Sequence, residues 1–165
     1  MAVSTNCAVI TGYSVAALRQ GPELFWAVQQ LDQTASFAPW PAAAWSNLDE
    51  RYWVVVAAGD GETPPAKNEP ALRGFALAHQ GLDGDWHLLN LTVAPASRRQ
   101  GVGRALLHYL QHLAGVASIY LEVAESNTAA RELYRQGGFQ ELCRKKAFYQ
   151  DGQAAFALQW RRDNT

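Results

Sequence analysis

The segment from Arg98 to Leu107 reads RRQGVGRALL and places two glycines and three arginines at the start of a helical run. Glycine at such a position lets the backbone approach a ligand and points successive N–H groups outward. The first amides of a helix have no partner inside the helix and lie at the positive end of its dipole. Together with arginine side chains they form a site for an anion such as phosphate. A tight turn with solvated arginines is the alternative that the pattern alone leaves open.

This segment matches neither of two familiar phosphate-binding glycine patterns. The dinucleotide fingerprint requires a third glycine, and the P-loop requires Gly-Lys-Ser/Thr after its glycines. His108 and His112 lie downstream at helical spacing, but the glutamate of a zinc-protease motif does not stand between them and no third ligand is near in the sequence. The sequence therefore predicts an anion site and no metal site.

The elements that must hold this segment alternate between strands and helices. We predict strands at residues 7–13, 51–58, 72–80, 85–95, 118–124, 139–149 and 154–160, and helices at 22–31, from the glycines to about 114, and at 127–138. The three strands between 51 and 95 should form an antiparallel meander, and the apolar run at 118–124 should be buried on both faces. A connector with two prolines and two tryptophans at 37–45 and a polar loop at 59–70 interrupt the regular elements.

Length and composition limit the classes of protein to which this chain can belong. With 165 residues, of which 48% are hydrophobic and 18% charged, residues 1–165 are expected to form one globular domain. The net charge of −1 provides no global field for nucleic acid or for a membrane surface. The N-terminus lacks a secretory signal, no apolar run reaches the ~20 residues of a membrane span, and two distant cysteines make no disulfide framework. These features predict a cytoplasmic protein with reduced thiols.

Two motifs resemble those of one enzyme family. The residues RRQGVG at 98–103 fit the pattern Arg/Gln-x-x-Gly-x-Gly/Ala, and SNTAARELYRQGGF at 126–139 fits Asn-x-x-Ala-x-x-Leu-Tyr-x-x-x-Gly-Phe. Both patterns are those of the GNAT family of acetyl-coenzyme A-dependent N-acetyltransferases, and the order of predicted elements also resembles that family over the whole chain. The resemblance implies an α/β GNAT fold, with a central mixed sheet flanked by helices. It also implies acetyl-coenzyme A as the co-substrate, with no metal.

Within this family the sequence is most similar to the RimI type, whose members acetylate the N-terminal alanine of a ribosomal protein. The strand residues LEV before SN, the basic-then-aromatic run RKKAFY, the DG turn and FAPW carry this resemblance. The chain departs from the RimI pattern at Pro41, where a capping serine is common, and in its long loop at 59–70. The resemblance implies a protein N-terminus as the acceptor, with Trp40, Trp45 and Tyr149 as candidate acceptor-binding residues.

The resemblance also assigns a cofactor site. A GNAT strand splays from its neighbour beside the glycine motif, so the backbone of residues 91–93 would hold the pantetheine arm. The Val93 amide is then the candidate donor to the oxyanion. The pyrophosphate would lie on the amides of residues 99–104. The predicted cofactor-binding residues are Leu91, Thr92, Val93, Arg98, Arg99, Gln100, Gly101, Val102, Gly103, Arg104, Asn127 and Tyr134.

Acetyl transfer needs an acid for the departing thiolate and a base for the amine. Residues that match Tyr134 and Glu122 have these roles in the enzymes that the chain resembles, so we predict Tyr134 as the acid and Glu122 as the base, directly or through water. Without the resemblance, Tyr134 would be a packing residue of an amphipathic helix, and Glu122 a strand residue facing solvent or an arginine. An α-amine, with a pKa of about 7.7–8.0, demands less of a carboxylate base than a lysine at about 10.4.

The sequence leaves two other functions open. A related enzyme that acetylates a polyamine, an antibiotic or an amino acid would share the cofactor site. A GNAT-shaped sensor would bind acetyl-coenzyme A without turning it over, although the presence of both Glu122 and Tyr134 argues against it. The basic run at 144–146 would either contact a cofactor phosphate or be solvated. The oligomeric state is not encoded in any pattern found here.

Overall fold

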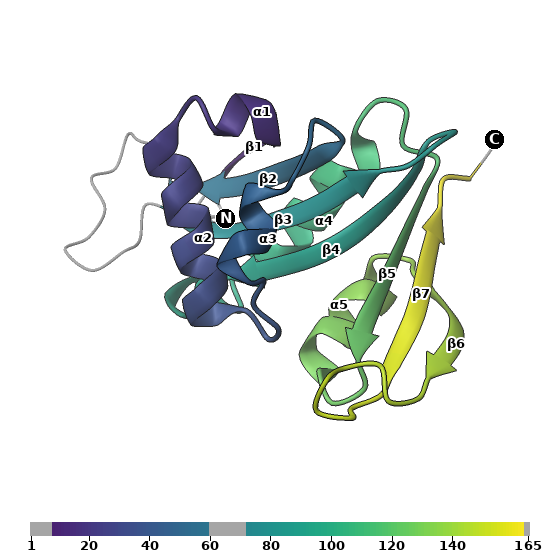
Figure 1. The fold of residues 1–165 in the computed structure, drawn as a ribbon. Helices are drawn as coiled ribbons and strands as arrows, with labels where there is room; N and C mark the ends of the chain where they lie inside the picture. The colour runs from purple at the N-terminus through teal and green to yellow at the C-terminus, as the bar shows by residue number, and fades with distance from the viewer. Residues whose placement is uncertain (1–7, 60–71, 164–165) are drawn as a thin grey trace, which may run out of the picture.

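A computed structural model describes residues 8–59 and 72–163 of the chain. Within these residues one mixed sheet has the strand order β1-β2-β3-β4-β5-β7-β6, and helices cover both of its faces (Figure 1). The strands are β1 (Val9–Ser14), β2 (Tyr52–Ala58), β3 (Leu72–Gln80), β4 (Asp85–Val93), β5 (Ser118–Ala124), β6 (Gln140–Lys145) and β7 (Ala155–Arg161). The helices are α1 (Val15–Leu18), α2 (Pro22–Ala35), α3 (Ala42–Ser46), α4 (Val102–His112) and α5 (Thr128–Gln136), with a 3₁₀ turn, η1, at Pro95–Ser97.

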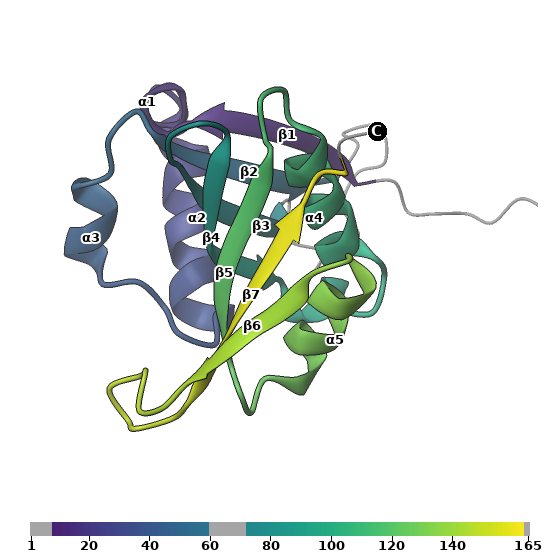
Figure 2. The same cartoon turned by 90° about the vertical axis from the view of Figure 1, so that its right-hand side faces the viewer.

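The alternation of side chains along β2 divides the core into two parts. Successive residues of a strand point to opposite faces of its sheet. Val54 and Val56 are therefore buried with residues of α1, α2 and α3, whereas Val55 and Ala57 are buried with residues of α4 and α5. Leu106 at the centre of the α4 stripe is completely buried. Figure 2 shows the two helical layers on opposite sides of the sheet.

The parallel pair β4 and β5 opens partway along its length. Its pairing joins Asp85–Leu88 to Ser118–Leu121. Beyond these residues β4 continues along β3 while β5 continues along β7, so the two strands diverge (Figure 1). The register of β3 against β4 shifts between Leu77 and Ala78, a bulge of the kind that bends a strand. The divergence is the splayed strand that the GNAT resemblance implied, and the backbone of residues 89–93 borders it.

Most predicted elements are confirmed, with differences at their ends. The antiparallel meander consists of β2, β3 and β4, and the predicted fold class, a mixed sheet flanked by helices, is correct. α2 continues to Ala35, four residues beyond the predicted end. The end of the predicted connector, with Ser46 after it, forms α3, for which Pro41 is the N-cap residue. Proline suits this position because the N–H that it lacks has no partner at a helix start.

The prediction that β5 is buried on both faces is wrong. Tyr120 and Glu122, on one face of the strand, are only partly buried. That face is uncovered because β5 has left β4 and the helices α1–α3 lie over the other half of the sheet. Most of the loop predicted at 59–70, and Cys7, lie outside the described residues. In the described part of the chain, no helix has the length and apolarity needed to cross a membrane.

Candidate active site

The Gly-x-Gly segment forms the turn between β4 and α4. After η1 the chain passes through Arg99 and Gly101, whose φ angles of 61° and 81° lie in the left-handed region. Glycine adopts this conformation without the steric cost that a Cβ atom brings. A Cβ built on Gly101 would meet no atom within 4 Å, so the turn is open on that side. The start of this 11-residue helix therefore has the geometry of the anion site predicted from the sequence.

Gly103 allows α4 to lie close to its neighbours. A Cβ at this position would stand 3.3 Å from a methyl group of Leu133 and 3.5 Å from a methyl group of Val93. The first distance is shorter than an ordinary carbon–carbon contact and the second is an ordinary contact, so a side chain here would have to displace Leu133 of α5. The close approach brings the start of α4 against the end of β4. A ligand that binds both backbones requires this arrangement.

The side chain of Arg98 is exposed and makes two hydrogen bonds to backbone carbonyls. Its Nε donates to the Val93 carbonyl at 3.2 Å, and its Nη2 donates to the Ala35 carbonyl at 3.3 Å. The last carbonyls of a helix have no partner within it, and the guanidinium satisfies the one that ends α2. Arg98 therefore ties the end of α2 to the end of β4, and its contact with the cofactor stays a prediction.

Gln100 likewise has partners within the fold. Its side chain accepts from Arg73 Nη2 at 3.0 Å and donates to the Ala96 carbonyl at 3.1 Å, which braces the turn before α4. Arg99 and Arg104 are exposed at the same turn. These two arginines, and the amides of the turn, are candidates for binding a phosphate.

A pocket lies between the diverging strands β4 and β5. Five residues predicted for the site line it: Leu91, Glu122, Asn127, Tyr134 and Tyr149. They come from β4, β5, the start and middle of α5, and the loop between β6 and β7. These five residues are up to 58 positions apart in the sequence, from 91 to 149. It contains both of the predicted catalytic groups.

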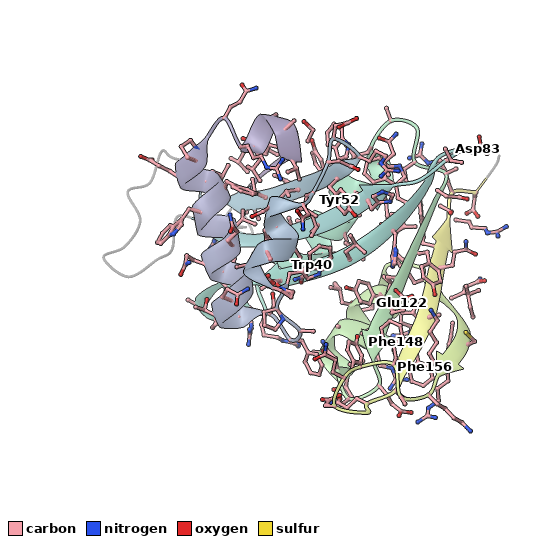
Figure 3. The ribbon with its side chains drawn as sticks, viewed as in Figure 1. Trp40, Tyr52, Asp83, Glu122, Phe148 and Phe156 are labelled. Atoms are coloured by element: carbon pink, nitrogen blue, oxygen red, sulfur yellow. The ribbon has the colours of Figure 1, made fainter. Side chains whose placement is uncertain are left out.

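The acceptor side of this pocket includes residues that were not predicted. Phe37 and Ala38, from the connector after α2, line it together with Leu89 and Asn90 of β4. Figure 3 shows Glu122 on β5, with Trp40 on the α2–α3 side of the opening. Side chains from the connector and β4 thus line the pocket together with Glu122.

Glu122 is held by two basic side chains. It accepts from Lys145 Nζ at 2.8 Å, lies 2.8 Å from Nε2 of His87, and has a side chain that is 13% exposed. Burial raises the pKa of this carboxyl group, but hydrogen bonds from His87, Lys145 and Tyr120 outweigh burial and lower the pKa of Glu122 to about 2. The carboxylate is ionised at neutral pH. It is also a weak proton acceptor for an α-ammonium group, whose ordinary pKa is about 7.7–8.0.

Tyr134 presents a phenol that stays protonated. Its residue is 7% exposed, and its ring packs against Phe139 with the centroids 5.5 Å apart. Burial raises the pKa of the Tyr134 phenol above its ordinary value. At neutral pH the group is therefore a proton donor, as an acid toward a thiolate must be. Asn127 caps the same helix by accepting from the Ala130 amide at 3.2 Å, which fixes the start of α5 at the pocket.

A buried carboxylate links the α2–α3 side of the pocket to β4. Asp32 of α2 is completely buried. It accepts hydrogen bonds from the Ser36 hydroxyl at 2.6 Å, Asn90 Nδ2 at 2.7 Å, the Trp40 amide at 2.9 Å and Trp45 Nε1 at 3.0 Å. Each carboxylate oxygen thus accepts two hydrogen bonds. This one side chain fixes the connector and β4 relative to each other.

The same network uses the side chain of Thr92. Its hydroxyl lies 2.6 Å from the Ser36 hydroxyl and donates to Asn90 Oδ1 at 2.9 Å. Only the backbone of Thr92 is left for the predicted contact with a cofactor. Residue 92 is therefore both part of the splayed strand and part of the network that holds it.

The prediction that Trp45 lines the acceptor groove is wrong. Trp45 is 1% exposed, and its ring lies about 6 Å from those of Phe25 and Phe75. The short helix α3 turns the indole into the core, where Asp32 accepts its N–H. Trp40 is partly exposed and tilts against Trp45 at 6.2 Å, so it remains a candidate for contact with the acceptor.

The sequence analysis did not predict two residues that hold the site together, Asp32 and His87, and only one of them could have been found from the sequence. Asp32 follows Val28 by four positions and so lies on the apolar face of α2, where a carboxylate requires partners. The sequence therefore contained a sign that Asp32 is buried and hydrogen-bonded. His87 meets Glu122 only because β4 and β5 pair in parallel with the register that joins His87 to Tyr120. No local pattern indicates this register.

The basic run at 144–146 and the two histidines of α4 also make contacts within the protein. Arg144 pairs with Glu125 at 2.7 Å, and Lys145 pairs with Glu122, so two members of the basic run bind carboxylates of the protein. The rings of His108 and His112 stack with centroids 4.0 Å apart. Among residues 8–59 and 72–163, no three His, Cys, Asp or Glu side chains gather as a metal site would require.

Comparison with known proteins identifies the family. The model of the Acetyltransferase (GNAT) family matches residues 9–139, which include both motifs and the pocket as far as Tyr134. The chain belongs to the GNAT family. Membership confirms the resemblance found in the sequence, and makes the protein an acetyl-coenzyme A-dependent N-acetyltransferase.

GNAT relatives of known activity are similar over most of the chain. The ribosomal protein bS18-alanine N-acetyltransferase of Escherichia coli strain K12 is 35% identical over 127 residues, which are 74% of this chain and 79% of that protein. The crystal structure of the Escherichia coli ribosomal-protein-S18-alanine N-acetyltransferase superposes with a TM-score of 0.70 at 29% identity, over 95% of this chain and 99% of that one. Arabidopsis thaliana NAA60 in complex with acetyl-CoA has a TM-score of 0.69 at 18% identity, over 93% and 100% of the two chains, and shares the fold.

The Asp32 network yields a prediction about stability. Asp32→Asn keeps the size of the side chain but turns an NH₂ group toward donors, so two buried N–H or O–H groups lose their acceptor. We expect a loss of about 3 kcal/mol or more in the free energy of unfolding, measured by urea denaturation. Asp49→Asn is the matched control, because Asp49 pairs with Arg51 at the surface and its loss should change the free energy of unfolding little. Equal losses in the two variants would contradict the role given to Asp32.

Proposed function

We propose that this GNAT enzyme transfers an acetyl group from acetyl-coenzyme A to the N-terminal α-amine of a protein, with a ribosomal protein as the expected acceptor. The observation that carries the proposal is the single pocket between β4 and β5 lined by Glu122, Asn127 and Tyr134. The 35% identity with the bS18-alanine N-acetyltransferase supports the same class of acceptor. Such an acceptor places the reaction in the cytoplasm.

The fold offers acetyl-coenzyme A a backbone surface from α4 to the opening in the sheet. The amides at the start of α4 would bind the pyrophosphate, and the exposed Arg99 and Arg104 would add charge-assisted hydrogen bonds. The pantetheine arm would extend along residues 91–93, where β5 no longer pairs with β4. Val93 would supply a backbone amide to the oxyanion, and loss of such a donor costs ~3 kcal/mol in transition-state stabilisation.

The chemistry is a direct transfer within a ternary complex. A bond forms between the amine nitrogen and the thioester carbonyl carbon, and the bond from that carbon to sulfur breaks. The amine must lose a proton first, because an ammonium group has no free electron pair. Glu122 would attract the ammonium group and direct its deprotonation. Tyr134 would donate its phenolic proton to the departing thiolate and recover a proton from the nitrogen that has been acylated.

An extended peptide fits the acceptor side of the pocket. Phe37 is 55% exposed and Tyr149 is half-buried, and they line the pocket from opposite sides of the opening. Two aromatic walls would hold the first residues of a chain while its amine reaches Glu122. A small polyamine would use fewer of these contacts, so the surface favours a protein N-terminus.

The open turn at Gly101 predicts a change in cofactor affinity. Gly101→Ala places a methyl group where a phosphate would lie, and we expect acetyl-coenzyme A to bind at least about tenfold more weakly in calorimetry. The left-handed φ should also cost about 1–2 kcal/mol of stability. Gly115→Ala is the control, because Gly115 has a φ of 79°, no atom within 4 Å of an added Cβ, and a position beyond the other end of α4. It should lose the same stability and keep the affinity. Equal affinities in the two variants would remove the phosphate site from this turn.

The roles of Tyr134 and Glu122 predict a loss of turnover without a loss of binding. Tyr134→Phe and Glu122→Gln should each lower kcat about 10²-fold, because the first removes the proton donor to the thiolate and the second removes the charge that directs deprotonation of the ammonium group. The dissociation constant for acetyl-coenzyme A should change little. Stopped assays of free thiol, with calorimetry on the same samples, measure both quantities. Glu125→Gln, which alters an exposed carboxylate just after β5 that pairs with Arg144, should retain full turnover. Full activity in either catalytic variant contradicts its assigned role.

A panel of acceptors tests the proposed function itself. The panel contains a basic peptide that begins with alanine, the same peptide with a blocked N-terminus, and polyamines, each with acetyl-coenzyme A. We expect thiol release with the unblocked peptide alone. Turnover of polyamines would favour a small-molecule acetyltransferase instead. Tight binding of acetyl-coenzyme A without turnover of any amine would favour a sensor.

A further inference from the structure

The chemistry described so far leaves His87 without a role. This residue of β4 pairs with Tyr120 of β5 immediately before the two strands separate. Its Nε2 lies 2.8 Å from Oε2 of Glu122, its ring lies edge-on to that of Tyr120 at 5.2 Å, and its side chain is 38% exposed. The imidazole therefore lies one pair before the point where the strands separate, with one nitrogen bound to the carboxylate that lines the pocket.

The carboxylate decides which nitrogen of the imidazole is basic. An ionised carboxylate only accepts hydrogen bonds, so Nε2 of His87 must carry the proton that it shares with Glu122. When the ring is neutral, its lone pair is then on Nδ1. In serine proteases a carboxylate holds a catalytic histidine in one tautomer by the same principle. Lys145 binds the other oxygen of Glu122 and keeps the carboxylate in place.

A carboxylate and an imidazole differ in how well they accept a proton from an α-ammonium group. The pKa of Glu122, about 2, is far from the ordinary value of about 7.7–8.0 for an α-ammonium group. Imidazole is the side chain that ordinarily changes its charge between pH 5 and 8. The groups that face His87 are Glu122 and Tyr120 from β5, Lys145 from β6 beyond the carboxylate, and His79 from β3.

We propose that His87 accepts, on Nδ1, the proton that the α-ammonium group of the acceptor gives up, while Glu122 holds the ring and attracts the cation. The N–H bond of the ammonium breaks, an N–H bond forms at Nδ1, directly or over one water molecule, and the electron pair left on the amine attacks the thioester. The imidazolium returns its proton to solvent after each turnover. This inference rests on the proposed function, because it concerns the same pocket and acceptor.

The test compares pH profiles of kcat/KM for an alanine-terminated peptide between about pH 5.5 and 9.5, a range that covers imidazole and α-amine titration. His87→Gln retains an N–H donor for Glu122 but lacks a group that titrates. We expect kcat/KM to fall about 10²-fold at pH 7 and the deficit to shrink above about pH 8, where the amine arrives already neutral. Affinity for acetyl-coenzyme A should be unchanged.

His112→Gln is the matched control, because His112 is exposed on α4 and hydrogen-bonds the His108 carbonyl of its own helix. It should follow the wild-type profile throughout. A purely structural role for His87 would lower kcat/KM by the same factor at every pH. A constant factor, or no loss, therefore overturns the inference.

A second measurement depends on no acceptor. Nitrogen-15 shifts of the His87 ring across its titration should report a neutral form protonated on Nε2, and a neutral form protonated on Nδ1 overturns the inference. If the wild-type enzyme acetylates no peptide, the proposed function fails, and the tautomer still decides the basic atom of His87. The two failures are thus distinguishable.

Discussion

The divergence of β4 and β5 is the constraint on which the site depends. A strand inside a sheet pairs its N–H and C=O groups on both edges, and groups left unpaired away from water cost free energy. β4 pairs with β3 along its length but with β5 only over Asp85–Leu88. Ser118 Oγ donates to Asp85 Oδ1 at 2.6 Å and holds the closed end together. The opening is therefore wedge-shaped, with a free backbone edge that an extended ligand can pair with.

Different forces hold the two sides of this wedge. On the α2 side, the buried carboxylate of Asp32 fixes the connector and Asn90 of β4 through hydrogen bonds. On the β5 side, Glu122 is fixed by charge, between His87 and Lys145. The start of α4 relies instead on backbone geometry at Gly101, and its arginines serve partly as braces. A coenzyme common to a family can thus be bound by the backbone, while side chains around the pocket decide which amine enters.

The parts of this site that follow from local sequence were predictable, and the parts that follow from register were not. The glycine turn, α5 and the strands each carry a periodic or conformational signal over a few residues. The contact of His87 with Glu122 depends on how β4 and β5 align, which no local pattern encodes. The prediction for Trp45 is wrong because a Pro-rich connector has no periodicity that shows which way its side chains point. The short helix α3 turns the indole into the core. The bracing role of Arg98 could not be predicted either, because the two carbonyls that it binds belong to separate elements.

The charge of the cluster around Glu122 bears on how the site returns to its starting state. Lys145 and Glu122 cancel, so with a neutral His87 the three residues carry no net charge. Each carboxylate oxygen has room for a further hydrogen bond, and an arriving ammonium group is therefore attracted. Once the amine has become a neutral amide, a proton held on His87 leaves the cluster with a net positive charge. Because the His87 side chain is 38% exposed, solvent can take the proton from the ring, and the cluster resets without any movement of the backbone.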